Sequence, residues 1–253
     1  MKYGFCHLAI VPLRELASDR SEMKSQLLFG DIFEVLEEVA HNWIYIRNAY
    51  DNYEGFIDPK QQISIAEEEY NRLCKLQLVN DMPISIASSQ GEMHLPLACS
   101  FYEKDLQIKT FSYSLPAQLI SFNNNPLHNI MAVAKSFLNA PYLWGGKTLW
   151  GVDCSGFTQS VFKVMGIKLL RDASQQATQG EILSFLQEVK EGDLAFFDDE
   201  EGQINHVGIL LSANEIIHAS GKVRIDKIDH QGIFNEELGK YTHKLRILKR
   251  MIF

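Results

Sequence analysis

Residues 141–157 read P-Y-L-W-G-G-K-T-L-W-G-V-D-C-S-G-F, and this stretch organises the C-terminal half of the chain. After it, the apolar residues Phe157, Val161 and Val164 recur at helical spacing. This pattern predicts that Cys154 lies at or near the first turn of a helix. Unpaired backbone N–H groups and the helix dipole stabilise an anion at that position. We therefore predict a lowered thiol pKa and a nucleophilic Cys154.

Two histidines change the interpretation of Cys154, which taken alone would be a buried structural cysteine. Residues 205–211 read N-H-V-G-I-L-L, residues 215–219 read E-I-I-H-A, and a turn-like S-A-N lies between them. A hairpin about this turn predicts His206 directly opposite His218, with Cβ atoms about 4.5–5.5 Å apart. A cysteine and two facing histidines supply a nucleophile, a base and an orienting group. Such a set could instead ligate zinc, but the tight local spacing of a metal motif is missing, so we favour the nucleophile.

Four motifs together resemble the NlpC/p60 family of papain-like cysteine peptidases, which cut bacterial cell-wall peptides. They are Y-L-W-G-G, D-C-S-G-F, N-H-V-G-I and I-I-H-A-S, in this order, and they cover roughly the C-terminal half. The resemblance implies an α+β papain-like catalytic domain at residues 123–253. The site residues that it implies are the nucleophile Cys154, the base His206, the third polar residue His218, and Tyr142, which lines the site. We expect the Cys154 N–H and the Tyr142 hydroxyl to form an oxyanion hole.

The first half of the chain has the short strands and closely spaced turn signals of small β-barrels. Residues 1–60 resemble a bacterial SH3-like (SH3b) domain, with a G-D turn at residues 30–31 and a Y-E-G-F element at residues 53–56. Residues 61–122 are expected to hold a connector helix and a second, degenerate SH3-like barrel, chiefly because the family often has two. The predicted fold class is therefore multidomain, with N-terminal all-β SH3-like barrels before the α+β papain-like domain.

The domain combination resembles that of γ-D-glutamyl-L-diamino acid endopeptidases. The implied reaction is hydrolysis between D-Glu and the diamino acid of peptidoglycan stem peptides with a free N-terminal L-Ala, in murein peptide recycling and without a cofactor or metal. The resemblance assigns the substrate ammonium to Asp153, Tyr53 and Glu22, with Glu15 as an alternative to Glu22. It assigns the D-Glu α-carboxylate to Ser155 and Ser174, with added charge from Arg171.

Two other functions remain open from the sequence. The chain could bind cell-wall peptides without cutting them, or it could be an amidase or acyltransferase on the same fold. The intact Cys154, His206 and His218 argue against the inactive binding protein. The products formed from defined muropeptides would separate all three.

Composition restricts the partners and the compartment. The net charge of −8 argues against nucleic acid, whose binding needs a basic face, and favours a small muropeptide. No apolar run approaches the roughly 20 residues of a membrane span, and the first residues lack a signal-peptide core. We expect a monomer that binds no membrane and is cytoplasmic, or periplasmic if a signal peptide was trimmed. Cys6, Cys74 and Cys99 have no paired spacing and are expected to be buried, reduced thiols.

Overall fold

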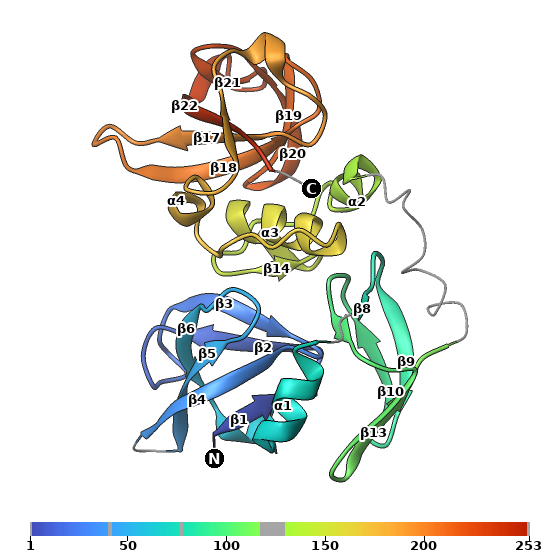
Figure 1. The fold of residues 1–253 in the computed structure, drawn as a ribbon. Helices are drawn as coiled ribbons and strands as arrows, with labels where there is room; N and C mark the ends of the chain where they lie inside the picture. Colours follow the sequence, from blue (N-terminus) through green and yellow to red (C-terminus); the bar gives the residue numbers. More distant parts are fainter. Residues whose placement is uncertain (1, 40–41, 76–77, 117–129, 252–253) are drawn as a thin grey trace. The chain divides into compact units, whose positions relative to one another are not determined.

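The computed structural model describes residues 2–39, 42–75, 78–116 and 130–251 (Figure 1). The chain divides into two compact units, Met1–Leu127 and His128–Phe253. In the described part of the chain, every helix is too short or too polar to cross a membrane.

The first unit begins with an antiparallel sheet of seven strands in the order β3-β2-β6-β5-β4-β1-β7. Its inward residues form an apolar core that includes Val11, Phe33 and Ile46. The predicted G-D turn matters here, because Gly30 has φ +84° and a Cβ on it would lie 1.7 Å from the Ser100 carbonyl oxygen. The strands are β1 (Tyr3–Phe5), β2 (Ile10–Arg14), β3 (Met23–Leu28), β4 (Ile32–Val39), β5 (Trp43–Asn48), β6 (Glu54–Ile57) and β7 (Ile63–Ile65).

The rest of the first unit packs on this sheet through aromatic rings. Phe29 contacts Phe5 and, from the later part of the unit, Phe101, Phe111 and Tyr113. The later part contains a two-stranded sheet, β8–β11, and a four-stranded sheet in the order β10-β9-β13-β12. Its elements are η1 (Pro59–Gln61), α1 (Glu67–Leu73), β8 (Leu78–Val79), β9 (Ile84–Ser88), β10 (Gly91–Leu95), β11 (Ser100–Phe101), β12 (Asp105–Ile108) and β13 (Phe111–Ser114).

The expected domain boundaries stay predictions. The one at residues 122–123 lies outside the described residues, as does the start of the helix expected from Leu127. That helix is described from Ile130 onward. One expectation in the first unit is wrong, because Cys74 is exposed at the end of α1, whereas Cys6 and Cys99 are buried.

The second unit combines short helices with a β-barrel. Its sheet has the order β16-β22-β17-β18-β19-β20-β21, and a further pairing between β21 and β22 closes it. The helices are α2 (Ile130–Ser136), α3 (Cys154–Val164), α4 (Ala173–Gln176) and η3 (Leu186–Glu188). The strands are β14 (Lys147–Thr148), β15 (Gly151–Val152), β16 (Glu181–Leu183), β17 (Leu194–Asp198), β18 (Ile204–Leu210), β19 (Glu215–Ser220), β20 (Lys222–Ile228), β21 (Gly232–Asn235) and β22 (Lys240–Arg250).

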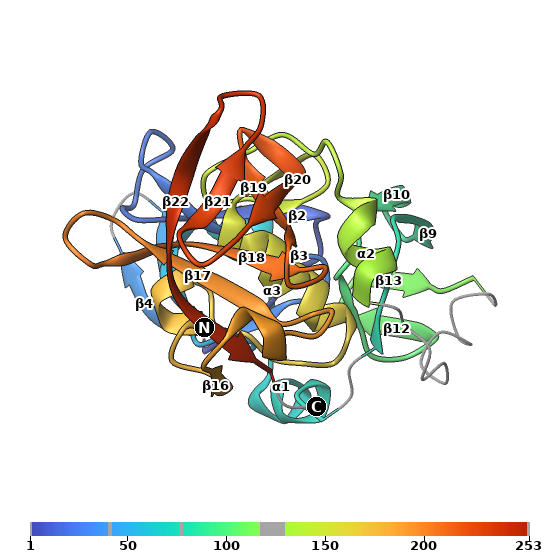
Figure 2. The same cartoon turned by 90° about the horizontal axis from the view of Figure 1, so that it is seen from above.

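Helix α3 lies against β18 and β19, on one side of the barrel (Figures 1 and 2). Every residue of α3 is buried. This packing fixes the N-terminus of α3 beside the strand that contains His206.

Candidate active site

Cys154 is the first residue of α3, as the sequence predicted. The preceding Asp153 caps the helix, and its Oδ1 accepts a hydrogen bond from the Gly156 N–H at 2.6 Å. The Cys154 Sγ lies 3.9 Å from the carbonyl oxygen of Asn205, and the N–H of Val207 also hydrogen-bonds to the sulfur. The thiol is therefore held by both residues that flank His206 in β18.

The predicted lowering of the Cys154 pKa is wrong. Burial raises the pKa of the thiol to about 12, and the negative charge of Asp153 adds to this effect. Hydrogen bonds from Val207 and Ser155 and the charge of Arg171 act in the opposite direction but are outweighed. The residue is only 6% exposed, so the desolvation that disfavours a thiolate outweighs the stabilisation of a negative charge by the start of the helix. In the resting site Cys154 is a neutral thiol.

The hairpin of β18 and β19 forms as predicted, but its register differs by two residues. His218 pairs with Gly208 rather than with His206. Side chains two residues apart point to the same face of a sheet, so His206 and His218 are diagonal neighbours. Gly208 leaves space for this diagonal, because a Cβ on it would lie 2.9 Å from the His218 Cβ.

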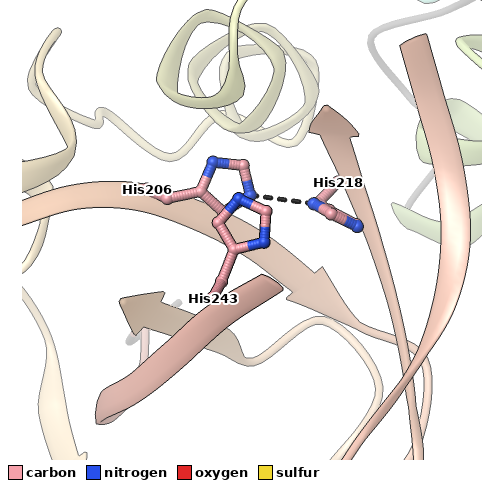
Figure 3. A group of neighbouring side chains, drawn as sticks. All are labelled: His206, His218 and His243. Carbon is pink, nitrogen blue, oxygen red and sulfur yellow. Dashed lines mark hydrogen bonds between the residues drawn. The ribbon is translucent and has the colours of Figure 1, made fainter. Parts of the chain in front are cut away.

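The two imidazoles are joined, and the chain of hydrogen bonds continues to a carboxylate. His206 Nε2 lies 2.8 Å from His218 Nδ1 (Figure 3), and His218 Nε2 lies 3.0 Å from Asp226 Oδ2. Arg224 binds the same carboxylate with two nitrogens, at 2.7 Å and 2.9 Å. Asp226 and Arg224 were not among the residues predicted from the sequence. Their spacing of two residues in the strand that follows His218 was the available signal.

A third ring, His243 of β22, also belongs to the cluster. It stacks on His206, with ring centroids 4.1 Å apart and an interplanar angle of 26° (Figure 3). Burial lowers the pKa of His243 to about 4. Burial, and then the charges of His218 and His243, lowers the pKa of His206 well below its ordinary value. Burial also lowers the pKa of His218, so all three rings are neutral at pH 7. Nothing in the sequence around His243 indicated this contact.

The possible zinc ligands in the structure are three histidines, rather than the cysteine and two histidines considered from the sequence. Within the described residues, His206, His218 and His243 each offer a nitrogen within 4.8 Å of the other two, and Cys154 is not part of this group. An imidazole binds zinc in its own plane, at about 2.0–2.1 Å from the nitrogen. Stacked rings have nearly parallel planes, so an ion in the plane of His206 would lie outside that of His243. The arrangement favours hydrogen bonding between neutral rings over metal ligation.

Next to Cys154, Arg171 forms a buried ion pair with Asp153 and a hydrogen bond with Ser155. All three residues were assigned to substrate binding. Arg171, which is 1% exposed, contacts Asp153 at 2.5 Å and 3.1 Å and donates to the Ser155 hydroxyl at 2.9 Å. Asp153 also accepts from the N–H groups of Gly145, at 2.8 Å, and Gly156. A carboxylate has about four lone-pair sites. The charge and acceptor sites of Asp153 are thus largely used within the protein, which weakens its assignment to a substrate ammonium.

The other predicted residues lie in different parts of the structure. Tyr142 is partly buried, and burial, then the charges of Cys154 and Asp153, raises its pKa to about 12. Ser174 is exposed in α4. In the first unit, Glu22 is exposed and Tyr53 is partly buried.

In the first unit, Lys24 lies beside two of the residues considered for the substrate ammonium, Tyr53 and Glu15. The Nζ of Lys24 lies 5.4 Å from the centre of the Tyr53 ring and 2.5 Å from a carboxylate oxygen of Glu15.

Family models match two separate parts of the chain. Residues 139–241 match the NlpC/P60 family, and residues 13–61 match the bacterial dipeptidyl-peptidase Sh3 domain. The chain therefore contains a bacterial SH3 domain, followed in the sequence by an NlpC/P60 domain. Peptidases of the NlpC/P60 family are usually cysteine peptidases.

Two relatives support this assignment, one over part of the chain and the other over most of it. The γ-D-glutamyl-L-lysine dipeptidyl-peptidase of Bacillus subtilis is 40% identical over 102 residues, which is 40% of this chain and 34% of that protein. The chain thus matches only about a third of the length of this relative. Dipeptidyl-peptidase 6 of Lysinibacillus sphaericus is 23% identical over 83% of this chain and 86% of its own.

A solved NlpC/P60 family protein of Bacillus cereus has the same fold along the chain. It has a TM-score of 0.76 and 18% identity, over 98% of this chain and 99% of its own. The fold class predicted from the sequence is confirmed, with an SH3-like domain before the NlpC/P60 domain and a β-barrel within the C-terminal half.

The match to the NlpC/P60 domain includes Cys154, His206, His218 and Asp226. It ends at residue 241, so His243 lies just beyond it although its ring is in contact with His206.

Proposed function

We propose that this chain is a cysteine peptidase that hydrolyses the γ-D-Glu–diamino acid bond of peptidoglycan stem peptides whose N-terminal L-Ala is free. The observation that carries the proposal is the position of the Cys154 thiol between the residues that flank His206, in a domain of a peptidase family. The name of the Bacillus subtilis relative supports the choice of bond.

The proposed chemistry begins from a neutral pair. As the substrate binds, the thiol proton of Cys154 passes to His206, and the sulfur attacks the γ-carbonyl carbon of D-Glu. The C–N bond then breaks, and the imidazolium gives its proton to the leaving amine of the diamino acid. Water attacks the thioester with His206 as base, which releases L-Ala-D-Glu and restores the thiol. His218 orients His206 throughout.

Two donors are proposed for the oxyanion that forms at the carbonyl. One is the N–H of Cys154, which lies in the first turn of α3, where the helix itself provides no acceptor. The other is the hydroxyl of Tyr142, which keeps its proton because its pKa is raised to about 12. Losing one such donor typically costs about 2.7–4 kcal/mol of transition-state stabilisation.

Substrate recognition rests mainly on the family resemblance. Arg171, Ser155 and the exposed Ser174 are proposed to bind the D-Glu α-carboxylate. For the ammonium, Glu22 and Tyr53 of the SH3 domain are proposed together with Asp153. The internal partners of Asp153 leave it a smaller share of this role than the sequence suggested.

The proposed setting is the cytoplasm, where a monomer would act on small turnover peptides. The acidic chain, with its net charge of −8, suits a small peptide better than an anionic polymer.

The test compares L-Ala-γ-D-Glu-L-Lys with its N-acetyl form, with products identified by mass spectrometry. We expect release of lysine from the free peptide and a kcat/KM at least about 10²-fold lower for the acetylated one, because acetylation removes the charge that the site would bind. Cys154→Ser is the matched control and should release nothing. An intact free peptide would exclude this substrate, and a product cut elsewhere would identify an amidase or transferase.

A further inference from the structure

We propose that Asp226 is a positioning residue that sets the tautomer of His206 through His218, and that Arg224 holds Asp226 for this task. The inference deepens the proposed function and rests on it. Asp226 does not contact the thiol, so it would act only through the two histidines.

The three strands place these residues by a simple rule of register. In the β18–β19 pair His218 lies opposite Gly208, two residues from His206. In the β19–β20 pair His218 lies opposite Arg224, two residues from Asp226. Each step therefore crosses to the next strand and moves two residues along it, which keeps every side chain on one face of the sheet.

The Asp226 carboxylate, at the end of this series of hydrogen bonds, is ionised. Burial favours the protonated form of Asp226, but hydrogen bonds from His218 and Arg224 outweigh burial and lower its pKa. An ionised carboxylate can only accept hydrogen bonds. His218 must therefore donate from Nε2 to Asp226, across 3.0 Å.

This donation determines the position of the remaining hydrogens. Burial lowers the pKa of His218, although Asp226 opposes this effect, so the ring is neutral at pH 7 and carries a single N–H. With its hydrogen on Nε2, His218 accepts at Nδ1, and His206 must donate from Nε2 across 2.8 Å. The Nδ1 of neutral His206 is then bare, and it lies on the side of the ring away from His218 (Figure 3).

A bare Nδ1 is what the proposed reaction requires of His206. Without the carboxylate, His218 could carry its hydrogen on Nδ1 and donate to His206 Nε2. His206 would then carry its hydrogen on Nδ1 and could not accept the proton of the Cys154 thiol at that atom. The role of Asp226 is therefore to exclude this reversed chain of hydrogen bonds.

Arg224 keeps the carboxylate in place. Its two hydrogen bonds to Asp226 occupy both oxygens, and it also reaches Glu237 at 3.1 Å. Its side chain is 17% exposed, so it can be changed with less damage to the core than Asp226, which is 4% exposed. This difference gives two variants with different risks of misfolding.

The decisive variant is Asp226→Asn, which keeps the shape but can offer an N–H to His218. Nitrogen-15 NMR of the ring nitrogens reports the tautomer of His206 without any substrate. We expect the protonated nitrogen of His206 to change from Nε2 to Nδ1, and kcat to fall about 10²-fold with KM unchanged. This loss is smaller than the roughly 10⁴-fold effect of changing a carboxylate that touches the base directly. Asp226→Glu should recover part of the activity.

Asp229→Asn is the matched control, since Asp229 follows the same strand but bonds to Tyr241. It should leave both the tautomer and kcat unchanged. If Asp226→Asn does not fold, Arg224→Gln replaces it, with an expected loss of about 10-fold in kcat. An unchanged His206 tautomer, or a kcat within twofold of the native value, in the folded variant would overturn the inference. A wrong choice of substrate instead leaves the native protein inactive while the NMR difference persists.

Discussion

At the residue scale, the thiol of Cys154 is shielded rather than activated in the resting structure. A pKa of about 12 leaves little thiolate near neutral pH, and the lowered pKa of His206 prevents the ring from being the cationic partner. In the proposed reaction, the thiolate would therefore form only after substrate has bound.

This state predicts the pH dependence of alkylation. With iodoacetamide, labelling of Cys154 should keep increasing from pH 6 to pH 10, because the neutral thiol is the main species over that range. The exposed Cys74 provides an internal reference in the same peptide map. A plateau in the Cys154 rate below pH 8 would instead show a preformed thiolate–imidazolium pair.

Also at the residue scale, His243 should contribute to acid sensitivity. Its pKa is about 4 in the folded state and about 6.5 when unfolded, so the unfolded state binds more protons between these values. The stability is therefore unaffected above pH 6.5, falls as the pH decreases from 6.5 to 4, and falls no further from this cause below pH 4. His206 and His218 contact this ring, and the charges of His218 and Asp226 act on its pKa.

His243→Phe keeps a ring over His206 but removes this titration. Between pH 7 and pH 5, the loss in the free energy of unfolding should be about 2 kcal/mol smaller than in the native protein. Urea denaturation at both pH values measures it. His230→Ala, at an exposed histidine, is the control and should behave as the native protein does. An equal loss in His243→Phe would show that the ring titrates normally.

At the element scale, the β18–β19 pair depends on Gly208. A Cβ there would lie 2.7 Å from Ile216 Cδ1 and 2.9 Å from His218 Cβ, so Gly208→Ala must displace His218 or separate the strands. We expect a loss of about 1–3 kcal/mol in stability and a fall in kcat of at least about 10-fold.

A second glycine separates these two effects. Gly202→Ala lies in the preceding hairpin, where a Cβ meets nothing within 4 Å but φ is +79°. It should reduce stability by strain without changing kcat, which chemical denaturation and a peptide assay can show together. If both variants lost activity in proportion to stability, the space beside His218 would have no separate effect on kcat.

Elements that depend on local pattern could be predicted, whereas those that depend on register could not. The period of the apolar residues placed Cys154 at the start of its helix, and the turn at residues 212–214 placed the hairpin correctly. The two-residue offset of His218 depends on the geometry of the turn between β18 and β19. The approach of His243 depends on the pairing of β22, a strand far along the chain. The prediction of a lowered pKa for the Cys154 thiol was wrong for a similar reason, because a local sequence pattern does not show burial by distant segments.

At the scale of the whole molecule, each unit has its own apolar core, one around Val11, Phe33 and Ile46 and the other around Ala195, Phe197 and Ile233. We therefore expect residues 1–127 and residues 128–253 to fold when produced separately. Each fragment should show a cooperative urea transition by circular dichroism. An unfolded second fragment would show that the barrel needs the first unit.

The same fragments test the proposed role of the SH3 domain. If that domain selects the free ammonium, residues 128–253 should cleave the free and N-acetyl peptides with similar kcat/KM. A preference retained by the fragment would place the selection within the second unit.

The closing of the barrel by β22 also has a consequence in time. This strand pairs with β16, β17 and β21, and it supplies the ring that covers His206. A ribosome adds about 5–20 residues each second, so residues 155–239 separate the synthesis of Cys154 from that of β22 by several seconds or more. Until β22 is made, His206 lacks this cover and the barrel beside α3 is not closed, so we expect Cys154 to be more open to oxidants and electrophiles than in the folded chain. We therefore expect the oxidation of Cys154 to be fastest while the chain is still being made.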